Sequence, residues 1–362
     1  MNCHSKTALL ALLTLGALAA AAGAKTLSVE NNGVDGPNCG GKLGACRSIS
    51  RAIGNAAAGD RILVGPGVYG DIDGDNAFTS PGDEAAQVDF GCHCMVRVHK
   101  AVTVVSAQGA SATTLSAGNA PFESLVTITA GDATFGEQDK GFFVSASPFE
   151  ALTYDGVGIR TTAATAGVKI GGNVVLNTVT GFQLYGSGHL VEHNRAAGNH
   201  RGFAVLGDEM TLQHNVAMGN EDGIVVGAAS AWLESNAVIG NRIVGVALLR
   251  GQEHHVRHSA VLGNPGGGVQ VDTFCPGTLC KNVNGQVNLN DIYGNGGAGN
   301  CGIINAKNLS LGTLEARGNY WGRPGGPGAD PGDTVCNLGA STSNGAIQTY
   351  PAELVLDIAP QH

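Results

Sequence analysis

The sequence is poor in charge. Only 14% of its 362 residues are Asp, Glu, Lys or Arg, and the 20 basic residues are outnumbered by 29 acids. Charged residues that favour helices are therefore scarce, whereas glycine is abundant at 57 residues. This composition favours many tight turns between short strands. An acidic chain is also a poor general binder of nucleic acid or anionic membranes, so neither is expected as a partner.

Long apolar runs are missing everywhere except near the N-terminus. There, His4 and Lys6 precede the apolar run ALLALLTLGALAAAA. The tripeptide Ala22-Gly23-Ala24 begins at the last alanine of this run. This pattern is typical of a secretory signal peptide, so we expect cleavage after Ala24 and a secreted or periplasmic protein. A single membrane anchor is the alternative, but the run is short and ends in small residues. No later stretch is long enough to predict a transmembrane segment.

Removal of residues 1–24 would leave a formal charge of 19 − 29 = −10 and an even number of cysteines. In an exported protein an even number indicates disulfides. The eight are Cys39, Cys46, Cys92, Cys94, Cys275, Cys280, Cys301 and Cys336. Close spacing suggests that the first two pair, as do Cys275 and Cys280, which leaves Cys301 for Cys336. A bridge across the C-x-C of Cys92 and Cys94 is tight, so these sulfurs could instead reach elsewhere or bind a metal, and the pairing stays open.

A repeat dominates the middle of the sequence. The segments VEHNRAAGN, LQHNVAMGN and LESNAVIGN start at Val191, Leu212 and Leu233, 21 residues apart. Two series of asparagines keep the same step: Asn173, Asn194, Asn215 and Asn236, and Asn199, Asn220 and Asn241, with Asn264 following after 23 residues. Such a period indicates a solenoid. Short alternating stretches between Gly and Asn favour strands and turns over helices. We therefore expect an all-β parallel β-helix of about 21–23 residues per coil, with coils roughly 4.8 Å apart.

Three stretches resemble one known family. The pattern V-x-x-N-x-A-x-x-N-x-x-G-F-x-V from Val191 to Val205 is similar to the repeat of the right-handed parallel β-helix, pectin-lyase-like superfamily. CRSISRAIGNAAAGDRILVGPGVY, from Cys46, resembles the opening module of that family, and NYWGRPGGPGADPGD, from Asn319, resembles the motif after its last coils. The resemblance implies a short capping helix at the N-terminal end.

The domain prediction follows from this resemblance. We expect a single elongated domain over residues 25–362, with regular coils at about 167–271 and a closing segment at about 319–362. The coils between about 60 and 166 are less regular in sequence. Oligomeric state is not predicted.

Strand alternation assigns the repeat positions to faces. If Val191, Leu212, Leu233 and Val256 point inward, their neighbours point outward. One outward row is then Leu190, Thr211, Trp232 and His255, and the other is Glu192, Gln213, Glu234 and Arg257. His193, His214, Ser235 and His258 fall at the corner beside the asparagines, where a scaffold role is favoured over a shared metal.

The outward rows carry the candidate site. An exposed Trp over polar groups is a common way to hold a sugar ring, so Trp232 and Gln213 are predicted to bind substrate. The catalytic candidates, which could supply proton transfer and anion stabilisation, are Glu192, Glu234, His255 and Arg257. The alternative is a cross-strand surface ion pair between Glu234 and Arg257 with Trp232 covered by a loop.

Two further groups are candidates with ordinary alternatives. Arg201 and Arg242, with His200, could face a uronate polymer or be solvated turn residues. Asp71, Asp73 and Asp75 resemble the start of a calcium loop, but Asn76 replaces the required Gly and no Glu stands at the twelfth position. Calcium is therefore a possible cofactor, and no other cofactor is predicted.

The functional expectation is an exported protein that binds or processes extracellular polysaccharide, with catalysis unproven. If it is an enzyme, we expect a polysaccharide lyase using Arg257 and His255, or an inverting glycoside hydrolase using Glu192 and Glu234. These two acids would stand two coils apart, roughly 9–10 Å. The Asp-Pro-His-Asp motif of alginate epimerases is absent. A third reading is a structural or adhesive surface protein that docks a partner through Leu206, Val225, Ala247 and Leu249.

Overall fold

A computed structural model describes most of the chain after residue 22. The described residues are 23–42, 44–73, 75, 78–84, 92–118, 122–145, 156–228, 230–251, 253–272, 285–307, 314–328, 332–337 and 347–349. The predicted signal peptide and the predicted Cys275–Cys280 pair lie outside them. No helix among the described residues is long and apolar enough to cross a membrane.

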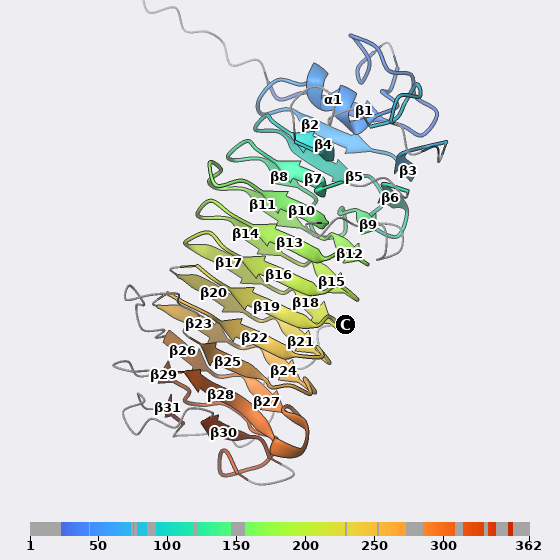
Figure 1. The fold of residues 1–362 in the computed structure, drawn as a ribbon. Helices are drawn as coiled ribbons and strands as arrows, with labels where there is room; N and C mark the ends of the chain where they lie inside the picture. Colours follow the sequence, from blue (N-terminus) through green and yellow to red (C-terminus); the bar gives the residue numbers. More distant parts are fainter. Residues whose placement is uncertain are drawn as a thin grey trace, which may run out of the picture.

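The described strands stack in three parallel sheets along one elongated solenoid (Figure 1). Sheet I contains β1 (Thr26–Val29), β2 (Arg61–Val64), β5 (Thr103–Ser106), β8 (Thr134–Phe135), β11 (Lys169–Gly171), β14 (Leu190–Glu192), β17 (Met210–Gln213), β20 (Ala231–Glu234), β23 (His254–Arg257), β26 (Gly285–Asn288), β29 (Leu314–Glu315) and β31 (Ile347–Gln348). Sheet II contains β3 (Gly67–Gly70), β6 (Thr113–Ser116), β9 (Phe143–Ser145), β12 (Val174–Leu176), β15 (Arg195–Ala197), β18 (Val216–Met218), β21 (Ala237–Ile239), β24 (Ala260–Leu262) and β27 (Asp291–Tyr293). Sheet III contains β4 (Cys94–Val98), β7 (Ser124–Ile128), β10 (Val157–Thr161), β13 (Thr180–Leu184), β16 (Arg201–Val205), β19 (Asp222–Val226), β22 (Val244–Leu248), β25 (Val269–Asp272), β28 (Cys301–Lys307) and β30 (Thr334–Asn337).

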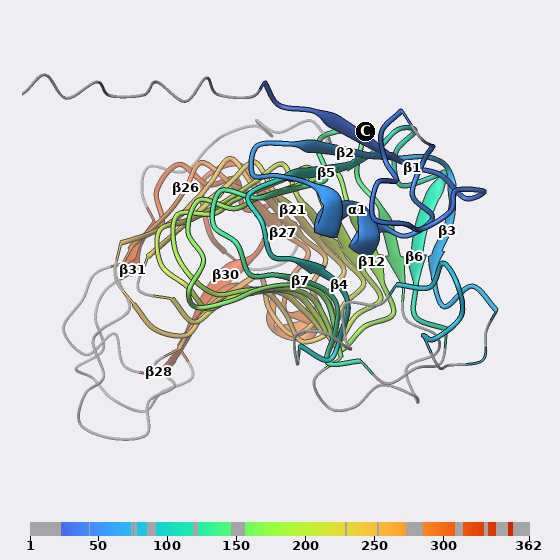
Figure 2. The ribbon, with the colours of Figure 1, turned by 90° about the horizontal axis from the view of Figure 1, so that it is seen from above.

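From β2 to β28 the chain visits the three sheets in the same order, I, II and III, in every coil. The view along the axis shows the coils superposed around one interior (Figure 2). The predicted parallel β-helix is therefore confirmed. The same three strands recur in the less regular coils before residue 166, where the connections between strands vary in length. A short 3-10 helix, η2 (Gly297–Gly299), lies between β27 and β28.

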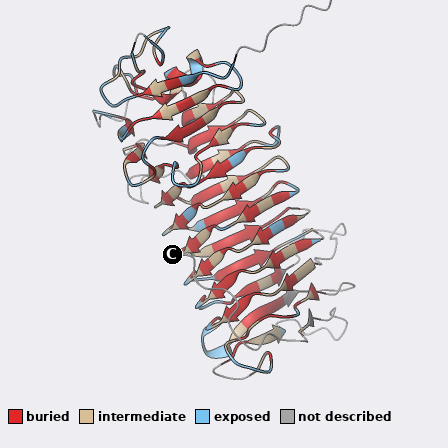
Figure 3. Ribbon diagram, turned by 180° about the vertical axis from the view of Figure 1, so that it is seen from behind, coloured by how far each residue is buried: buried red, intermediate tan, exposed pale blue. Residues whose placement is uncertain are grey.

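The interior is one continuous apolar core (Figure 3). The predicted inward positions Val191, Leu212, Leu233 and Val256 are at most 1% exposed. In sheet III, Phe182 and Phe203 stack with ring centroids 4.6 Å apart. Burial of one such side chain stabilises the fold by roughly 1.5–3 kcal/mol, so the repeated apolar position holds each coil on the next.

The turn between sheets I and II is held by the first asparagine ladder. The Asn194 side chain donates to the carbonyls of Ile170 (2.9 Å) and Glu192 (3.0 Å), and to Asn215 Oδ1 (3.1 Å). The Asn194 backbone N–H also donates to Asn215 Oδ1, at 3.0 Å. The ladder runs through Asn173, Asn194, Asn215, Asn236, Ser259, Asn290 and Asn319. These side chains are therefore scaffold, as the sequence predicts, and a buried amide satisfies the corner of each coil.

A second ladder occupies the turn between sheets II and III. It contains Asn199, Asn220, Asn241, Asn264 and Asn295, and it ends at Asp333. Asp333 accepts from the Asn295 backbone N–H at 3.2 Å and from its side-chain amide at 2.8 Å. Burial raises the pKa of Asp333 to about 6. Because the last rung has only to accept, a carboxylate can replace the amide there.

The N-terminal end is covered by α1 (Ile49–Asn55), which confirms the predicted capping helix. Ser48 is its N-cap and accepts from Arg51 N at 3.1 Å. The fully buried Glu84 carboxylate accepts from the backbone N–H groups of Ile49 (2.6 Å) and Ser50 (2.8 Å). A distant loop thus supplies an acceptor for the unpaired amides of the first helical turn.

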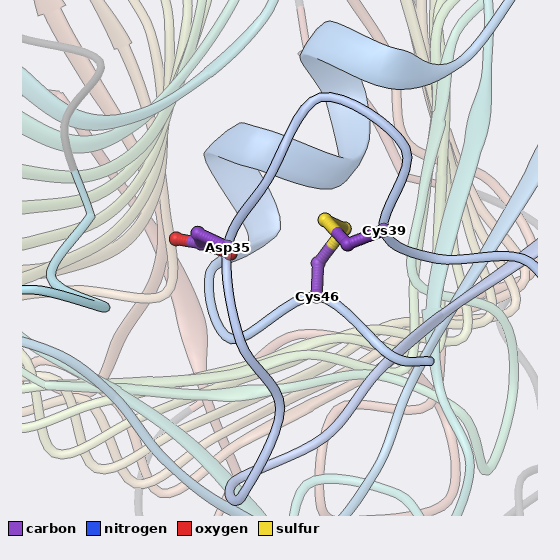
Figure 4. Close-up of side chains that lie close together, drawn as sticks. All are labelled: Asp35, Cys39 and Cys46. Atoms are coloured by element: carbon purple, nitrogen blue, oxygen red, sulfur yellow. A yellow bond between two sulfur atoms is a disulfide. The ribbon is translucent and has the colours of Figure 1, made fainter. Parts of the chain in front are cut away.

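Three disulfides lie among the described residues. They are Cys39–Cys46, Cys92–Cys94 and Cys301–Cys336. The tight C-x-C bridge therefore forms in this structure. The first bridge lies beside α1 (Figure 4), where the Asn55 side chain contacts both sulfurs.

Replacing a ladder asparagine should destabilise the whole protein. Asn215→Ala removes the acceptor for Asn194 and the donor to the Val191 carbonyl, which leaves buried polar groups unpaired. We expect a loss of about 3–5 kcal/mol in the free energy of unfolding, measured by urea denaturation. The exposed Asn38 is the matched control, and Asn38→Ala should change it by less than about 0.5 kcal/mol. Equal effects of the two variants would contradict the structural role of the ladder.

Glu84 should make stability depend on pH. Burial raises the pKa of Glu84 from 4.5 to about 7, so the folded protein keeps a proton that the unfolded chain releases near 4.5. The free energy of unfolding should therefore fall as pH rises from about 4.5 to about 7, by on the order of 3 kcal/mol from this group. Urea titrations of the protein and of Glu84→Gln across this range should show a smaller pH slope for the variant. The same slope in both would contradict the prediction.

Candidate functional site

The two outward rows of sheet I form as predicted. Strand register places Leu190, Thr211, Trp232, His255 and Gln286 in one row. It places Glu192, Gln213, Glu234, Arg257 and Asn288 in the other. The side chains come from β14, β17, β20, β23 and β26, and the alternation of each strand turns them away from the core. We call these two rows the sheet I face.

Trp232 is the central aromatic of this face. Its side chain stacks on His255, with ring centroids 3.8 Å apart and planes at 15°. Trp232 nevertheless stays 44% exposed, so no described loop covers it. The Arg257 guanidinium lies 5.9 Å from the Trp232 ring. The stack leaves an exposed indole edged by a cation and an imidazole.

The acids and bases of the face are paired differently from the expected ion pair. Glu234 Oε1 lies 2.6 Å from Nδ1 of His258, a corner residue, and Arg257 donates to Gln286 Oε1. The alternative prediction of a Glu234–Arg257 ion pair is therefore wrong. A bond along the diagonal to the corner of the next coil replaces it, because His258 is one coil and one residue beyond Glu234. His258 and Gln286 are members of the site that the sequence did not indicate.

Glu192, Gln213 and His255 complete the sheet I face. Gln213 Nε2 donates to Glu192 Oε2 at 2.8 Å, which fixes the orientation of both side chains. Burial, and then the charge of Arg257, lowers the pKa of His255, so this imidazole is held neutral near pH 7. The face therefore offers carboxylates, a neutral imidazole and a guanidinium within neighbouring coils.

Arg201 and Arg242 lie elsewhere. Arg201 begins β16 in sheet III, and Arg242 lies in the turn before β22, so neither joins Trp232 and Gln213 on sheet I. Both also contact acids: Arg201 lies 4.0 Å from Asp222, and Arg242 binds Glu221. Solvated ion pairs of this kind are common at surfaces and need no ligand.

The corner histidines stack on one another. His193 and His214 stack with centroids 5.0 Å apart and planes at 13°. Both have a positive φ of 55°, as do Ser235 (54°) and His258 (47°) in the next two coils, because the turn after each of these sheet I strands takes a left-handed residue. Two parallel rings do not converge on one ion, which agrees with the favoured scaffold role.

The acidic loop before residue 84 brings together a set of three acids that differs from the predicted set in one residue. Oxygens of Asp71, Asp73 and Asp83 lie within 4.8 Å of one another, and Asp75 is outside this group. Asp73 accepts from Ser80 Oγ at 2.5 Å, and this hydrogen bond is the main cause of its lowered pKa. Calcium at this loop stays a prediction.

A further polar row on sheet III is absent from the sequence predictions. Strand register aligns Arg97, Thr127, Arg160 and Gln183 on the outward side of β4, β7, β10 and β13. Arg160 lies 3.6 Å from Glu123 and 6.0 Å from the Tyr185 ring centroid. Connections of variable length separate these residues in the sequence, so no fixed step reveals the row.

The apolar row proposed for adhesion is largely covered. Val225 is 8% exposed and Ala247 5%, and with Val244 they form a small cluster against which Leu249 packs. Leu206 is half-buried. The row therefore offers little apolar surface to a partner.

These features define the class of the protein as a right-handed parallel β-helix. Residues 149–326, just under half of the chain, match the family described as "Periplasmic copper-binding protein (NosD)". No curated protein matches the sequence at a significant level.

Solved structures share the fold at low sequence identity. The A-module of Azotobacter vinelandii mannuronan C-5 epimerase AlgE4 is 12% identical with a TM-score of 0.51, over 84% of this chain and 89% of that one. The AlgE6 A-module of the same organism is 14% identical with a TM-score of 0.48, over 86% and 93%. Pectin methylesterase PemA from Erwinia chrysanthemi is 11% identical with a TM-score of 0.36, over 88% and 92%. At sequence identities this low, the similarity concerns the fold alone and does not extend to activity.

Neither described cluster of three potential His, Cys, Asp or Glu ligands fits a copper centre. Copper in proteins prefers imidazole, thiolate and thioether ligands. The described clusters of three potential ligands are Asp35, Cys39 and Cys46, and Asp71, Asp73 and Asp83. The first holds its two sulfurs in a disulfide (Figure 4), and the second has only carboxylates. Neither contains a histidine.

The exposure of Trp232 can be measured directly. The chain has two tryptophans, and Trp321 is 0% exposed whereas Trp232 is 44% exposed. Acrylamide quenching of fluorescence should therefore resolve one accessible and one inaccessible component. Trp232→Phe should remove the accessible component alone. A single inaccessible component in the unaltered protein would show that Trp232 is covered.

Proposed function

We propose that this protein is exported and binds extracellular polysaccharide through the sheet I face. The observation that carries the proposal is the exposed Trp232, stacked on His255 and flanked by the row from Glu192 to Arg257. An indole covers the apolar face of a sugar ring, while adjacent carboxylate, amide and guanidinium groups hydrogen-bond its hydroxyls.

Three observations support export and a glycan ligand. The N-terminus has the pattern of a signal peptide that ends at Ala24. Disulfides, as in Cys39–Cys46 and Cys301–Cys336, persist in oxidising compartments. The matched family is described as periplasmic, and the AlgE4 module that shares the fold is named for an epimerase of mannuronan, a polysaccharide.

Catalysis is the second candidate function, and the sheet I face offers groups for two kinds of reaction. Glu192 and Glu234 stand in one row two coils apart, roughly 9–10 Å, at the wide end of the spacing of inverting glycoside hydrolases. A lyase would use Arg257 to neutralise a uronate carboxylate and His255, held neutral, to accept the adjacent proton. Both reactions would use the surface on which Trp232 holds the sugar.

Binding should depend on the indole. On a glycan array, Trp232→Ala should weaken binding of the retained ligand about five- to thirtyfold, because a stacked aromatic contact contributes on the order of 1–2 kcal/mol. The matched control is Ile243→Ala, since Ile243 is equally exposed at 45% but lies in the turn before β22. Retained binding in Trp232→Ala, or equal loss in both variants, would remove the sheet I face as the binding site.

Turnover is tested with the same polysaccharide panel. An enzyme should release unsaturated or reducing ends, and Glu234→Gln or Arg257→Gln should lower that rate at least about a hundredfold while binding persists. Binding of the polysaccharide without release of such ends would contradict catalysis and support the binding function alone. Release that survives both substitutions would exclude these residues as the catalytic groups.

A further inference from the structure

The three described disulfides close loops of very different size. Cys301 and Cys336 are 35 residues apart, Cys39 and Cys46 are 7 apart, and Cys92 and Cys94 only 2. A crosslink restrains the unfolded chain more when the loop that it closes is longer. Of the three described disulfides, Cys92–Cys94 therefore contributes least to the stability of the fold. Stabilisation of the fold does not explain why this bridge is present.

The residue inside the smallest loop has an unfavourable backbone conformation. His93 has a φ of 40°, in the left-handed region that a residue with a Cβ rarely adopts. Its carbonyl accepts from Glu123 N at 3.0 Å and from Ser124 N at 3.5 Å, so the next coil holds the loop in place. Opening the disulfide would let His93 leave this region, and that release favours the reduced form.

The two sulfurs differ in accessibility. Cys94 is the first residue of β4, is 0% exposed and lies in register with Ser124. Cys92 precedes the strand and is half-buried, and the His93 side chain between them is exposed. An external thiol therefore reaches Cys92 first, and Cys94 is the sulfur that leaves.

We propose that Cys92–Cys94 is a thiol–disulfide exchange site that a dithiol reduces while the other two described disulfides stay oxidised. A thiolate of the dithiol attacks Cys92 Sγ, the Cys92–Cys94 bond breaks, and Cys94 Sγ leaves with the electron pair and takes up a proton. The second thiolate of the dithiol then attacks the dithiol sulfur that is bonded to Cys92 Sγ. This step releases Cys92, which is protonated. The bridge gains two electrons and two protons, and the dithiol becomes a disulfide.

The test uses the intact mature protein in graded ratios of reduced to oxidised dithiothreitol, followed by alkylation and mass spectrometry. Cys92 and Cys94 should be half alkylated at a ratio at least about tenfold lower than the ratio for Cys39–Cys46 or Cys301–Cys336. With glutathione in place of dithiothreitol, the mixed disulfide should form on Cys92. Simultaneous reduction of all three pairs, later reduction of Cys92–Cys94, or glutathione found on Cys94 alone would overturn the proposal.

A pair of glycine variants tests the physical cause. His93→Gly accepts a positive φ without the steric cost, so its disulfide should require about a fivefold higher dithiothreitol ratio for half-reduction. Asp139 is the matched control, because it is exposed and has a φ of 61° outside any disulfide loop. Asp139→Gly should leave the ratio for Cys92–Cys94 unchanged. No shift in His93→Gly, or an equal shift in both, would contradict the role of the backbone at His93.

Discussion

The two asparagine ladders are the constraint on which the rest of the solenoid depends. A parallel β-helix must turn sharply between sheets, and each turn buries backbone groups that its own coil leaves unpaired. At the turns that the two ladders occupy, an asparagine amide in most coils satisfies these groups, because it accepts from the coil before it and donates both to the coil after it and to nearby carbonyls. A side chain that bonds to its counterpart in the next coil also keeps the turns aligned, even where longer connections separate the rungs.

This constraint determines the surface chemistry. With the turns aligned, the outward side chains of sheet I lie in straight rows at the spacing of β-strands, so Trp232 lies against His255 and Gln213 against Glu192. A row of this kind suits a linear polymer, because successive coils present their side chains along one line at a short regular spacing. The proposed polysaccharide site is thus a consequence of the same repeat that builds the core.

The ladders end where the solenoid departs from regularity, and acids appear there. Asp333 accepts from Asn295 at the last rung of the second ladder, and Glu84 accepts from the first turn of α1 at the opposite end. Both carboxyl groups are buried with raised pKa values. The Cys92–Cys94 bridge also belongs to this N-terminal part, where some connections between strands are long and the described turns hold no asparagine ladder.

The 21-residue step by itself determined the fold, the inward positions and the membership of both outward rows, because a side chain in a stacked coil has its neighbour fixed by the period. The sequence also indicated the capping helix and which cysteines could pair over short distances. Only the tertiary structure decided the partners of the charged residues. Glu234 binds His258 on the diagonal and not Arg257 in its own row, and Arg201 lies on sheet III whereas Trp232 lies on sheet I. Row membership follows from backbone periodicity, whereas the choice of partner follows from side-chain reach and from residues such as Gln286 that irregular connections bring alongside.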